Sequence, residues 1–407
     1  MDFQDTSELA AFRSNVKIWL EANATRRTDK LHMGMEGDTA FQEAKDWYKK
    51  KADDGFACLT WAKEYGGAGL TSLHEVVWTQ EVENYKTRDA HFVIGIGNCG
   101  PAVMHFASEE AKRKLLPRMA SAEDVWCQLF SEPSAGSDVA GLRTRAEPDG
   151  DHWVLNGQKI WTSGAQYSDY GVVLTRTDPT ISKYRGLTLF MIDMRQSGVE
   201  VRPIKQMDGG GHFNEVFFNN AIVPDIYRLG EVGGGWTGAL TVLMSERLAI
   251  SGVQPTGFPQ FLDLVKSLEL NGQLIANDPL VRDRLATWYS QYAGLQAVNK
   301  RMLTAVAKGG IAGAEASLGK LVGAVMNQEI ANFACQIFGP AGIVQDTELS
   351  PERAHFQQQV LFSPGVRLAG GTDEVMRNIL AEQVLGLPQE PRADKGIPFQ
   401  DIPTGPA

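Results

Sequence analysis

Apolar residues recur at helical spacing in the first and last parts of the chain. The segment 5–23 places apolar side chains three or four positions apart, and Asp5 with Glu8 is typical of a capping box at a helix start. In the last third, Asp278 followed by Pro279 predicts the beginning of a long helix. The same spacing predicts two later helices, over 313–338 and 372–385.

The middle of the chain has the pattern of a β domain. From Val125 the apolar runs become short, and Asn156 followed by Gly157 between two such runs is typical of a hairpin turn. The β pattern ends near Pro224 or at the glycines Gly233–Gly235, and helical spacing then resumes. Because strands and helices do not alternate, the sequence predicts an α+β fold without crossover helices.

Length and pattern together predict several domains. The 407 residues exceed what one small core organises. A final stretch rich in proline and charge is expected to be loose. The expected parts are a helical domain over 1–124, a β domain over 125–232, a helical bundle over 233–388 and a loose tail over 389–407.

Composition narrows the classes of partner and location. The net charge of −10 argues against a nucleic-acid partner, because phosphate binding needs a basic face. No apolar run approaches the roughly 20 residues that cross a bilayer, so we expect no membrane insertion. The four cysteines are far apart, and neither they nor the histidines show ligand spacing, so we predict no metal site. Scattered free thiols suit a reducing compartment, which favours a cytoplasmic location.

One glycine motif imitates a dinucleotide-binding fingerprint. Gly95, Gly97 and Gly100 fit the pattern Gly-x-Gly-x-x-Gly after an apolar triplet. The fingerprint needs a strand, a turn and a helix inside alternating β-α architecture. Here both flanks have helical spacing and no parallel strand follows. We therefore interpret these glycines as sites of close helix packing.

Two loops of the β domain could bind a flat or phosphorylated ligand. The stretch "FSEPSAGSD" (130–138) follows an apolar strand and combines hydroxyl groups with small residues that let backbone N–H groups approach a ligand. The stretch "IWTSG" (160–164) places Trp161 at a strand end, where its ring could stack on a planar cofactor. Taken singly, the first could equally be an ordinary polar turn, and Trp161 an ordinary core residue.

A carboxylate and a guanidinium interrupt an apolar helical stretch. In "LMSERLAISG" (243–252), Glu246 and Arg247 are flanked by apolar and small residues. Charges in such surroundings are unfavourable unless they are paired or used chemically. The sequence leaves two readings open: half of a structural ion pair, or a carboxylate kept dry for catalysis.

Four motifs, in order, resemble the acyl-CoA dehydrogenase family. They are "FSEPSAGSDVAGLRT", "NGQKIWTSG", "CQIFGPAG" and "GGTDEVMRNILAEQVLG", and the resemblance extends over the chain to about Pro388. It implies an α+β fold with an N-terminal helical domain, a middle β-barrel or sandwich domain and a C-terminal four-helix bundle. It also implies FAD as cofactor, an acyl-CoA substrate and a homotetramer or a hetero-oligomer with a related subunit.

The resemblance also assigns ligand contacts to individual positions. The cofactor contacts carried over are Gln128, Ser131, Gly136, Ser137, Trp161, Ser163, Gln336, Gly339, Thr372 and Glu374. Ser137 would also lie near the CoA ester, and Trp161 and Ser163 would face the flavin. Gln336 and Gly339 would reach the cofactor of a neighbouring subunit.

The resemblance implies removal of a proton from Cα and a hydride from Cβ, giving a trans-2-enoyl-CoA, with electrons passing to an electron-transfer flavoprotein. The usual base is the glutamate of a Glu-Gly-Thr motif, which reads Gly370-Gly371-Thr372 here. Some members carry the base in a Glu-Arg-Leu setting instead, and Glu246 matches it. Apolar surroundings would raise the pKa of Glu246 and strengthen it as a base. The backbone N–H of Gly370 would polarise the thioester carbonyl.

Some assignments stay open. Arg247 would support substrate binding or hold the helix through an ion pair. The stretch "LELNG" (268–272) lacks the arginine that many relatives use against FAD. Alternatives to the dehydrogenase are an acyl-CoA oxidase or flavin monooxygenase on the same fold, and a non-catalytic subunit of a hetero-oligomer. The space left by Gly370 and Gly371 fits a branched or sterol acyl group as well as a fatty one.

Overall fold

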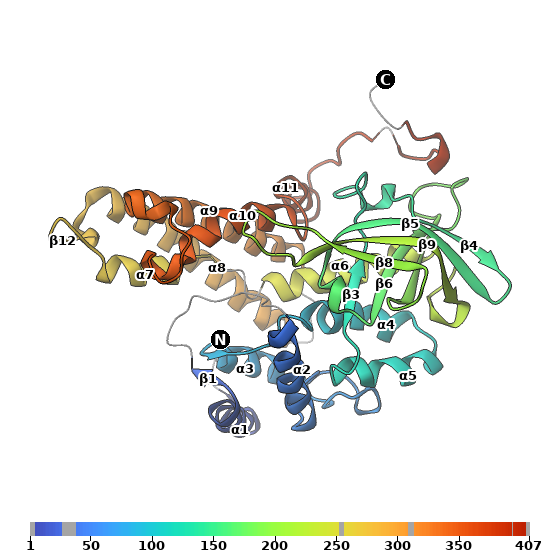
Figure 1. Cartoon of the computed structure of the whole chain (residues 1–407), viewed down its shortest axis with the longest axis horizontal. Helices are drawn as coiled ribbons and strands as arrows, with labels where there is room; N and C mark the ends of the chain where they lie inside the picture. Colours follow the sequence, from blue (N-terminus) through green and yellow to red (C-terminus); the bar gives the residue numbers. More distant parts are fainter. Residues whose placement is uncertain (1–4, 27–37, 252–255, 308–312, 393, 404–407) are drawn as a thin grey trace.

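The computed structural model describes residues 5–26, 38–251, 256–307, 313–392 and 394–403, without the side chains of 38–39, 246–251 and 306–307. The chain runs from a helical part through a β-sheet part to a second helical part, as the sequence predicts (Figure 1). The α+β class is therefore confirmed. Among the described residues, no helix combines the length and apolar character needed to cross a membrane.

The N-terminal part packs short helices against one another. They are α1 (Ser7–Asn23), α2 (Asp38–Asp53), α3 (Ser72–Val82), the π-helix η2 (Ile94–Cys99), α4 (Gly100–Phe106) and α5 (Glu109–Ala120). The first helix buries Val16 and Leu20, as its spacing predicts. The expected capping box at Asp5 and Glu8 is wrong. The Thr6 hydroxyl accepts the Leu9 N–H at 3.3 Å and caps the helix, while the Asp5 carboxylate accepts a hydrogen bond from Arg13.

The middle part is a twisted β sheet. Its strands are β3 (Trp126–Leu129), β4 (Arg145–Asp149), β5 (His152–Ser163), β6 (Tyr170–Arg176), β7 (Leu187–Asp193), β8 (Val199–Pro203), β9 (Phe213–Pro224) and β10 (Arg228–Leu229). Their order is β10-β7-β6-β4-β5-β9-β8, and β3 pairs with β6 in parallel. Alternate residues of β6 and β7 enter separate cores, one shared with α4 and α5 and one inside the β domain.

The expected hairpin turn at Asn156-Gly157 is wrong. Both residues lie inside strand β5, and the two-residue turn between β4 and β5 falls at residues 150–151. The pairing register of β5 with β9 shifts between Leu155 and Gly157, which marks a bulge. A Cβ at position 157 would lie 2.7 Å from the Thr144 Cα, so close backbone packing explains this glycine.

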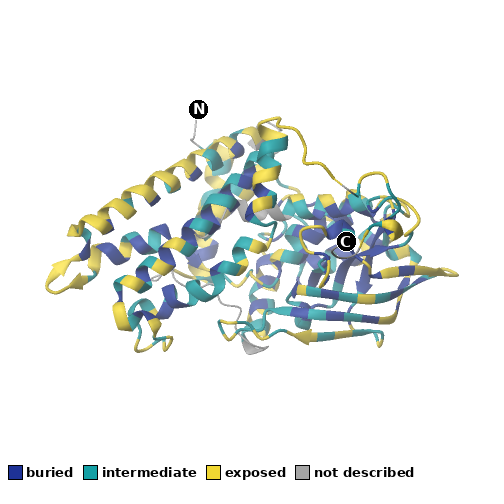
Figure 2. Cartoon of the chain, turned by 90° about the horizontal axis from the view of Figure 1, so that it is seen from above, coloured by how far each residue is buried: buried dark blue, intermediate teal, exposed yellow. Residues whose placement is uncertain are grey.

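The C-terminal part is a helical bundle. Its helices are α6 (Gly235–Ser251), α7 (Phe258–Ser267), α8 (Pro279–Ala307), α9 (Ser317–Ile337), α10 (His355–Leu368) and α11 (Asp373–Ile379). The predicted start at Pro279 is confirmed, because the Asp278 carboxylate accepts the N–H of Leu280 at 2.8 Å. Buried residues line the inward faces of these helices and the strands (Figure 2). The stretch "LELNG" forms a small hairpin of β11 (Glu269–Leu270) and β12 (Gln273–Leu274).

The tail differs from the expected loose segment. From the end of α11 the chain crosses to the β domain, where residues 394–403 pack against the loop 178–186 (Figure 1). The Phe399 side chain is 9% exposed, and its backbone N–H donates to the Ile181 carbonyl at 2.8 Å. One buried aromatic ring and backbone pairing are therefore enough to fix a stretch that composition marks as disordered.

An aromatic cluster joins the N-terminal part to the β domain. The ring of Phe41 stacks on Tyr167, with centroids 4.5 Å apart, and the edge of His91 meets both rings. Burial, together with the nearby His212, lowers the pKa of His91 below its ordinary value. The folded protein therefore favours the neutral imidazole.

We expect the midpoint of thermal unfolding to fall with the pH partly because of His91. Between about pH 7 and pH 5 the unfolded chain takes up this proton before the folded chain does, so stability is lost as the pH falls. His91→Gln should flatten the dependence of the midpoint on pH, whereas His105→Gln, at an exposed histidine, should leave it as in the wild type. Parallel curves for His91→Gln and the wild type would refute this account.

Candidate active site

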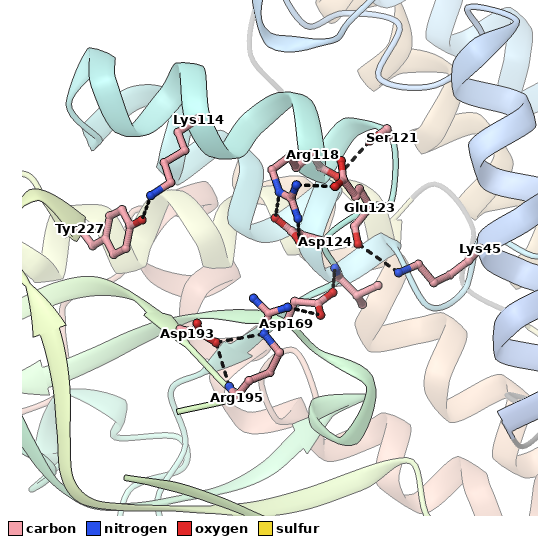
Figure 3. Close-up of polar contacts among 11 residues, drawn as sticks. Lys45, Lys114, Arg118, Ser121, Glu123, Asp124, Asp169, Asp193, Arg195 and Tyr227 are labelled. Carbon is pink, nitrogen blue, oxygen red and sulfur yellow. Dashed lines mark hydrogen bonds and ion pairs between the residues drawn. The ribbon is translucent and has the colours of Figure 1, made fainter. Parts of the chain in front are cut away.

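An ion-pair network fixes the point where the first helical part enters the β sheet (Figure 3). Arg118 donates to both oxygens of the buried Asp124, at 2.6 and 2.7 Å. The Asp169 carboxylate accepts the Val125 N–H at 2.8 Å and also meets Arg195. Because Val125 immediately precedes β3, these contacts set the position of that strand.

Gln128 on β3 faces the π-helix η2. Its Oε1 accepts a hydrogen bond from the buried Asn98 at 3.1 Å. Two of the three motif glycines allow close packing: a Cβ on Gly95 of η2 would lie 3.0 Å from the Trp126 Cβ, and one on Gly100, the first residue of α4, would lie 2.4 Å from the Trp61 ring. The interpretation as packing glycines is therefore confirmed for these two and wrong for Gly97, where a Cβ would meet nothing within 4 Å. π-helical turns are frequent at functional sites.

A buried ion pair locks the loop that follows β3. The Lys159 ammonium, from β5, lies 2.8 Å from Glu132 Oε1 and also donates to the Phe130 carbonyl at 3.1 Å. The Glu132 carboxylate accepts the backbone N–H groups of Arg143 at 2.7 Å and Thr144 at 2.9 Å. Lys159 is fully buried and Glu132 nearly so. One carboxylate thus joins the loop, strand β5 and the segment before β4.

Sequence reasoning missed this pair, although a signal existed. Strand β5 buries Trp153 and Leu155, and simple alternation along the strand places Lys159 on the same inward face. A lysine at an inward position, near in space to an acidic loop, predicts a buried pair. The partner, however, lies 27 residues away in the sequence, and no local rule finds it.

Burial and pairing shift the pKa of each of the two groups in opposite directions. Burial lowers the pKa of Lys159 to about 8, against the raising effect of Glu132. Burial alone would raise the pKa of Glu132, but the charge and hydrogen bond of Lys159, with those from Thr144 and Arg143, hold this pKa below its ordinary value. The carboxylate therefore stays ionised at neutral pH and keeps its three donors.

The locked loop displays small residues beside an exposed tryptophan. Gly136 and Ser137 are exposed, and a Cβ on Gly136 would meet nothing within 4 Å. The Ile160 N–H donates to the Ser131 carbonyl at 2.9 Å, which holds the end of β5 against the loop. Trp161 follows, with a positive φ of 61° and a 56% exposed side chain. A bulky residue in this conformation is strained, and such strain is common where a ligand is held.

Ser163 ends strand β5 on the same side of the β domain. It pairs with Phe213 of β9, and the Trp161 ring meets the Phe213 ring edge-on at 6.1 Å. The structure therefore places Ser131, at the start of the loop that carries Gly136 and Ser137, beside the end of β5 that carries Trp161 and Ser163.

A second group of predicted residues lies at the start of α11. The Thr372 hydroxyl accepts the Val375 N–H at 3.3 Å and caps the helix, which begins where the sequence predicts. Gly370 and Gly371 both have positive φ, at 66° and 100°. The buried Lys320 of α9 donates to the Gly371 carbonyl at 2.6 Å and to the Arg367 carbonyl at 2.9 Å. This turn is therefore fixed from the bundle side.

Glu374 is exposed beside this turn. Hydrogen bonds from its own backbone N–H and from Thr372 lower the pKa of its carboxyl.

Two predicted cofactor residues lie far from α11 within the chain. Gln336 lies in the last turn of α9 and Gly339 begins the turn η8 (Gly339–Ile343), and both are exposed. Lys320, which touches the Gly371 turn, lies near the other end of α9, about 24 Å away at 1.5 Å per residue. A single chain therefore does not unite the two groups.

Glu246 and Arg247 belong to helix α6, but their side chains lie outside the described part of the structure. The described residues of α6 pack against η2, β7 and α9. Ala239 and Val242 of this helix are fully buried in the core shared with the sheet.

Each of the three parts of this fold matches a described domain of one oxidoreductase family. Residues 6–123 match the N-terminal domain of the acyl-CoA dehydrogenases, residues 127–221 the middle domain and residues 233–385 the C-terminal domain. The chain therefore belongs to the acyl-CoA dehydrogenases, an oxidoreductase family.

Individual relatives match over nearly the whole chain. The acyl-CoA dehydrogenase IpdE1 of Mycobacterium tuberculosis is 35% identical, over 95% of this chain and 99% of its own length. IpdE1 of Mycolicibacterium smegmatis is 34% identical, over 94% of this chain and 99% of its own. The solved "Tcur3481-Tcur3483 steroid ACAD" is similar with a TM-score of 0.79 and 28% identity, covering 96% of this chain and 100% of that one. The solved ChsE4-ChsE5 complex from M. tuberculosis is similar with a TM-score of 0.78 and 26% identity, covering 96% of this chain and 100% of that one.

Removing the cation of the locked loop should destabilise the protein. Lys159→Met leaves the Glu132 carboxylate buried and unpaired, which costs about 3–5 kcal/mol. Urea unfolding should show a lower midpoint for this variant, and faster hydrogen exchange at the amides of 131–144.

Two further variants test the pairing. Adding Glu132→Gln to Lys159→Met should recover part of the loss, because the unpaired charge is removed. Lys205→Met, at an exposed lysine, should behave as the wild type. If the double variant is no more stable than Lys159→Met, the ion pair does not account for the effect.

Proposed function

We propose that this chain catalyses the FAD-dependent α,β-dehydrogenation of an acyl-CoA thioester to the trans-2-enoyl-CoA, and passes the electrons to an electron-transfer flavoprotein. The observation that carries the proposal is the loop 131–138, locked by the buried Glu132–Lys159 pair beside the exposed Trp161, in a chain that belongs to the acyl-CoA dehydrogenases. A rigid loop next to an aromatic ring suits a flat, phosphorylated cofactor.

The described residues fit FAD. The open space at Gly136 admits a ligand close to the backbone, and the exposed ring of Trp161 offers a stacking face. Residues proposed to hold the cofactor are Gln128, Ser131, Gly136, Ser137, Trp161, Ser163, Thr372 and Glu374, with Gln336 and Gly339 acting toward a neighbouring subunit. When bound, FAD would supply the hydride acceptor for the reaction.

We assign the proton transfer to Glu246. Helical spacing places position 246 four residues after Val242 and seven after Ala239, so it continues the face that these two buried residues define. A carboxylate on an apolar face has a raised pKa and is a stronger base toward the weakly acidic Cα–H. The Gly370 N–H would donate to the thioester carbonyl and stabilise the negative charge that develops there. Arg247 would help to hold the substrate.

The substrate class we propose is a bulky acyl-CoA with a branched or sterol-type acyl group. Where many family members carry the basic glutamate, this chain has Gly370, which removes a side chain from the region proposed for the thioester. The similarity to a structure described as a steroid dehydrogenase supports the same class.

Exposed apolar residues support assembly into a homotetramer or a hetero-oligomer. Ile343 is 85% exposed and Leu349 79%, close in sequence to Gln336 and Gly339. Large apolar side chains left exposed favour contact with a partner. Similarity to the ChsE4-ChsE5 complex supports a related second subunit. The four free cysteines fit the proposed cytoplasmic location.

Glu246→Gln should abolish turnover and keep the flavin. Loss of a general base lowers kcat by about 10²–10⁴-fold, and an artificial electron acceptor measures this directly. Glu231→Gln, at an exposed carboxylate just before α6, is the matched control and should keep wild-type turnover. Undiminished turnover in Glu246→Gln would show that another group takes the proton. Oxygen consumption without added acceptor would indicate an oxidase instead.

A panel of thioesters should reveal the substrate class. We expect kcat/KM to be about tenfold or more higher for branched or sterol side-chain thioesters than for short straight-chain ones, because a large apolar group fills the proposed space. Pairs of thioesters that differ only in remote branching provide the control. A strict preference for short straight chains would contradict the proposed substrate.

A further inference from the structure

The segment 394–403 forms a clasp between the bundle and the β domain. We call these residues the C-terminal clasp. They follow helix α11 in the chain but pack on the loop 178–186 of the β domain (Figure 1). The Gln400 N–H donates to the Pro179 carbonyl at 3.0 Å, and Pro398 bridges to Ser182. The clasp therefore touches the β domain through backbone as well as side chains.

The aromatic residue of the clasp, Phe399, packs on the buried Arg176 of the β domain. The Phe399 ring lies 3.7 Å from the guanidinium carbon of Arg176, which is 4% exposed. Arg176 donates to the carbonyls of Ala140 and Lys183, both at 2.6 Å. Burial lowers the pKa of Arg176 to about 10, well above neutrality, so it keeps its charge. One guanidinium thus connects the clasp to the segment immediately after the locked loop.

Its charged contact reaches the locked loop itself. The buried Lys183 ammonium donates to both oxygens of Asp138, at 2.7 and 2.9 Å, and also pairs with Asp394 of the clasp. Arg392 pairs with Asp394 at 3.0 Å and bonds the Tyr184 hydroxyl. Hydrogen bonds from Arg392 and Lys183 hold the pKa of Asp394 well below its ordinary value. Asp138 directly follows Ser137, so a single lysine links the clasp to a proposed ligand-binding residue.

We propose that the C-terminal clasp is a positioning element for substrate binding. Asp394, acting through Lys183, and Phe399, acting through Arg176, hold Asp138 and residues 140–142 in the conformation that presents Ser137. The effect on ligand affinity rests on the proposed function, whereas the anchoring of the loop does not. Because the clasp follows α11 in the chain, it also ties the Thr372 side of the site to the Ser137 side.

Two measurements on Asp394→Asn test the proposal. Amides of 134–142 in the ligand-free protein should exchange about fivefold faster or more, since a lost ionic anchor lowers the local opening free energy. In the holoenzyme, the KM for the thioester should rise about fivefold with little change in kcat, which is the pattern of lost uniform binding. Asp394→Glu should restore both values.

Two controls separate the outcomes. Asp401→Asn changes an exposed carboxylate within the same clasp and should leave exchange and KM unchanged. Phe399→Ala should reproduce the effects of Asp394→Asn by the second route, through Arg176. Unchanged exchange in both Asp394→Asn and Phe399→Ala would overturn the proposal, as would faster exchange with an unchanged KM. If the wild type binds no flavin and turns over no thioester, the proposed function fails and the exchange result alone decides the anchoring.

Discussion

The ion pair between Glu132 and Lys159 is the interaction on which the proposed site depends. Two buried charges are unfavourable unless every donor and acceptor is used. Here the carboxylate accepts two backbone N–H groups besides the ammonium, and the ammonium reaches a backbone carbonyl as well. The pair therefore fixes the loop 131–138 before any ligand arrives, and a ligand need not order it. The strained Trp161 is held next to that loop by the same strand.

Buried lysines recur as anchors around this region. Lys159 holds the loop after β3, Lys320 holds the turn before α11, and Lys183 joins the locked loop to the C-terminal clasp. Each ammonium is nearly fully buried and donates to carbonyl or carboxylate oxygens. A flexible stem with a compact charge can link segments that are distant in sequence. Loops from the β domain and the bundle are thereby set with the rigidity that a binding site needs.

Features of the fold that depend on short-range interactions could be predicted from the sequence. The α-β-α order, the start of α8 at Pro279 and the start of the last helix at Thr372 all follow from short-range rules. The turn predicted at Asn156-Gly157 was wrong because pairing of β5 with β9 and close packing on Thr144 override the preference of this dipeptide for turns. The prediction of a loose tail was wrong for 394–403 because the Phe399 ring packs on Arg176, more than 200 residues earlier in the chain. The lysine anchors have partners too distant in the sequence for a local pattern to detect. Ser131, Ser137 and Trp161 were singled out by the motifs alone, and their roles stay predictions.

An absorbance spectrum of the purified protein, recorded without oxygen before and after adding a bulky acyl-CoA thioester, tests the central claim most directly. The account predicts the bands of oxidised flavin at the start and their bleaching by the thioester, because proton and hydride leave the substrate together. Absence of flavin even after reconstitution with FAD would contradict the proposed cofactor site. Bound flavin that no thioester of the panel bleaches would contradict the proposed reaction.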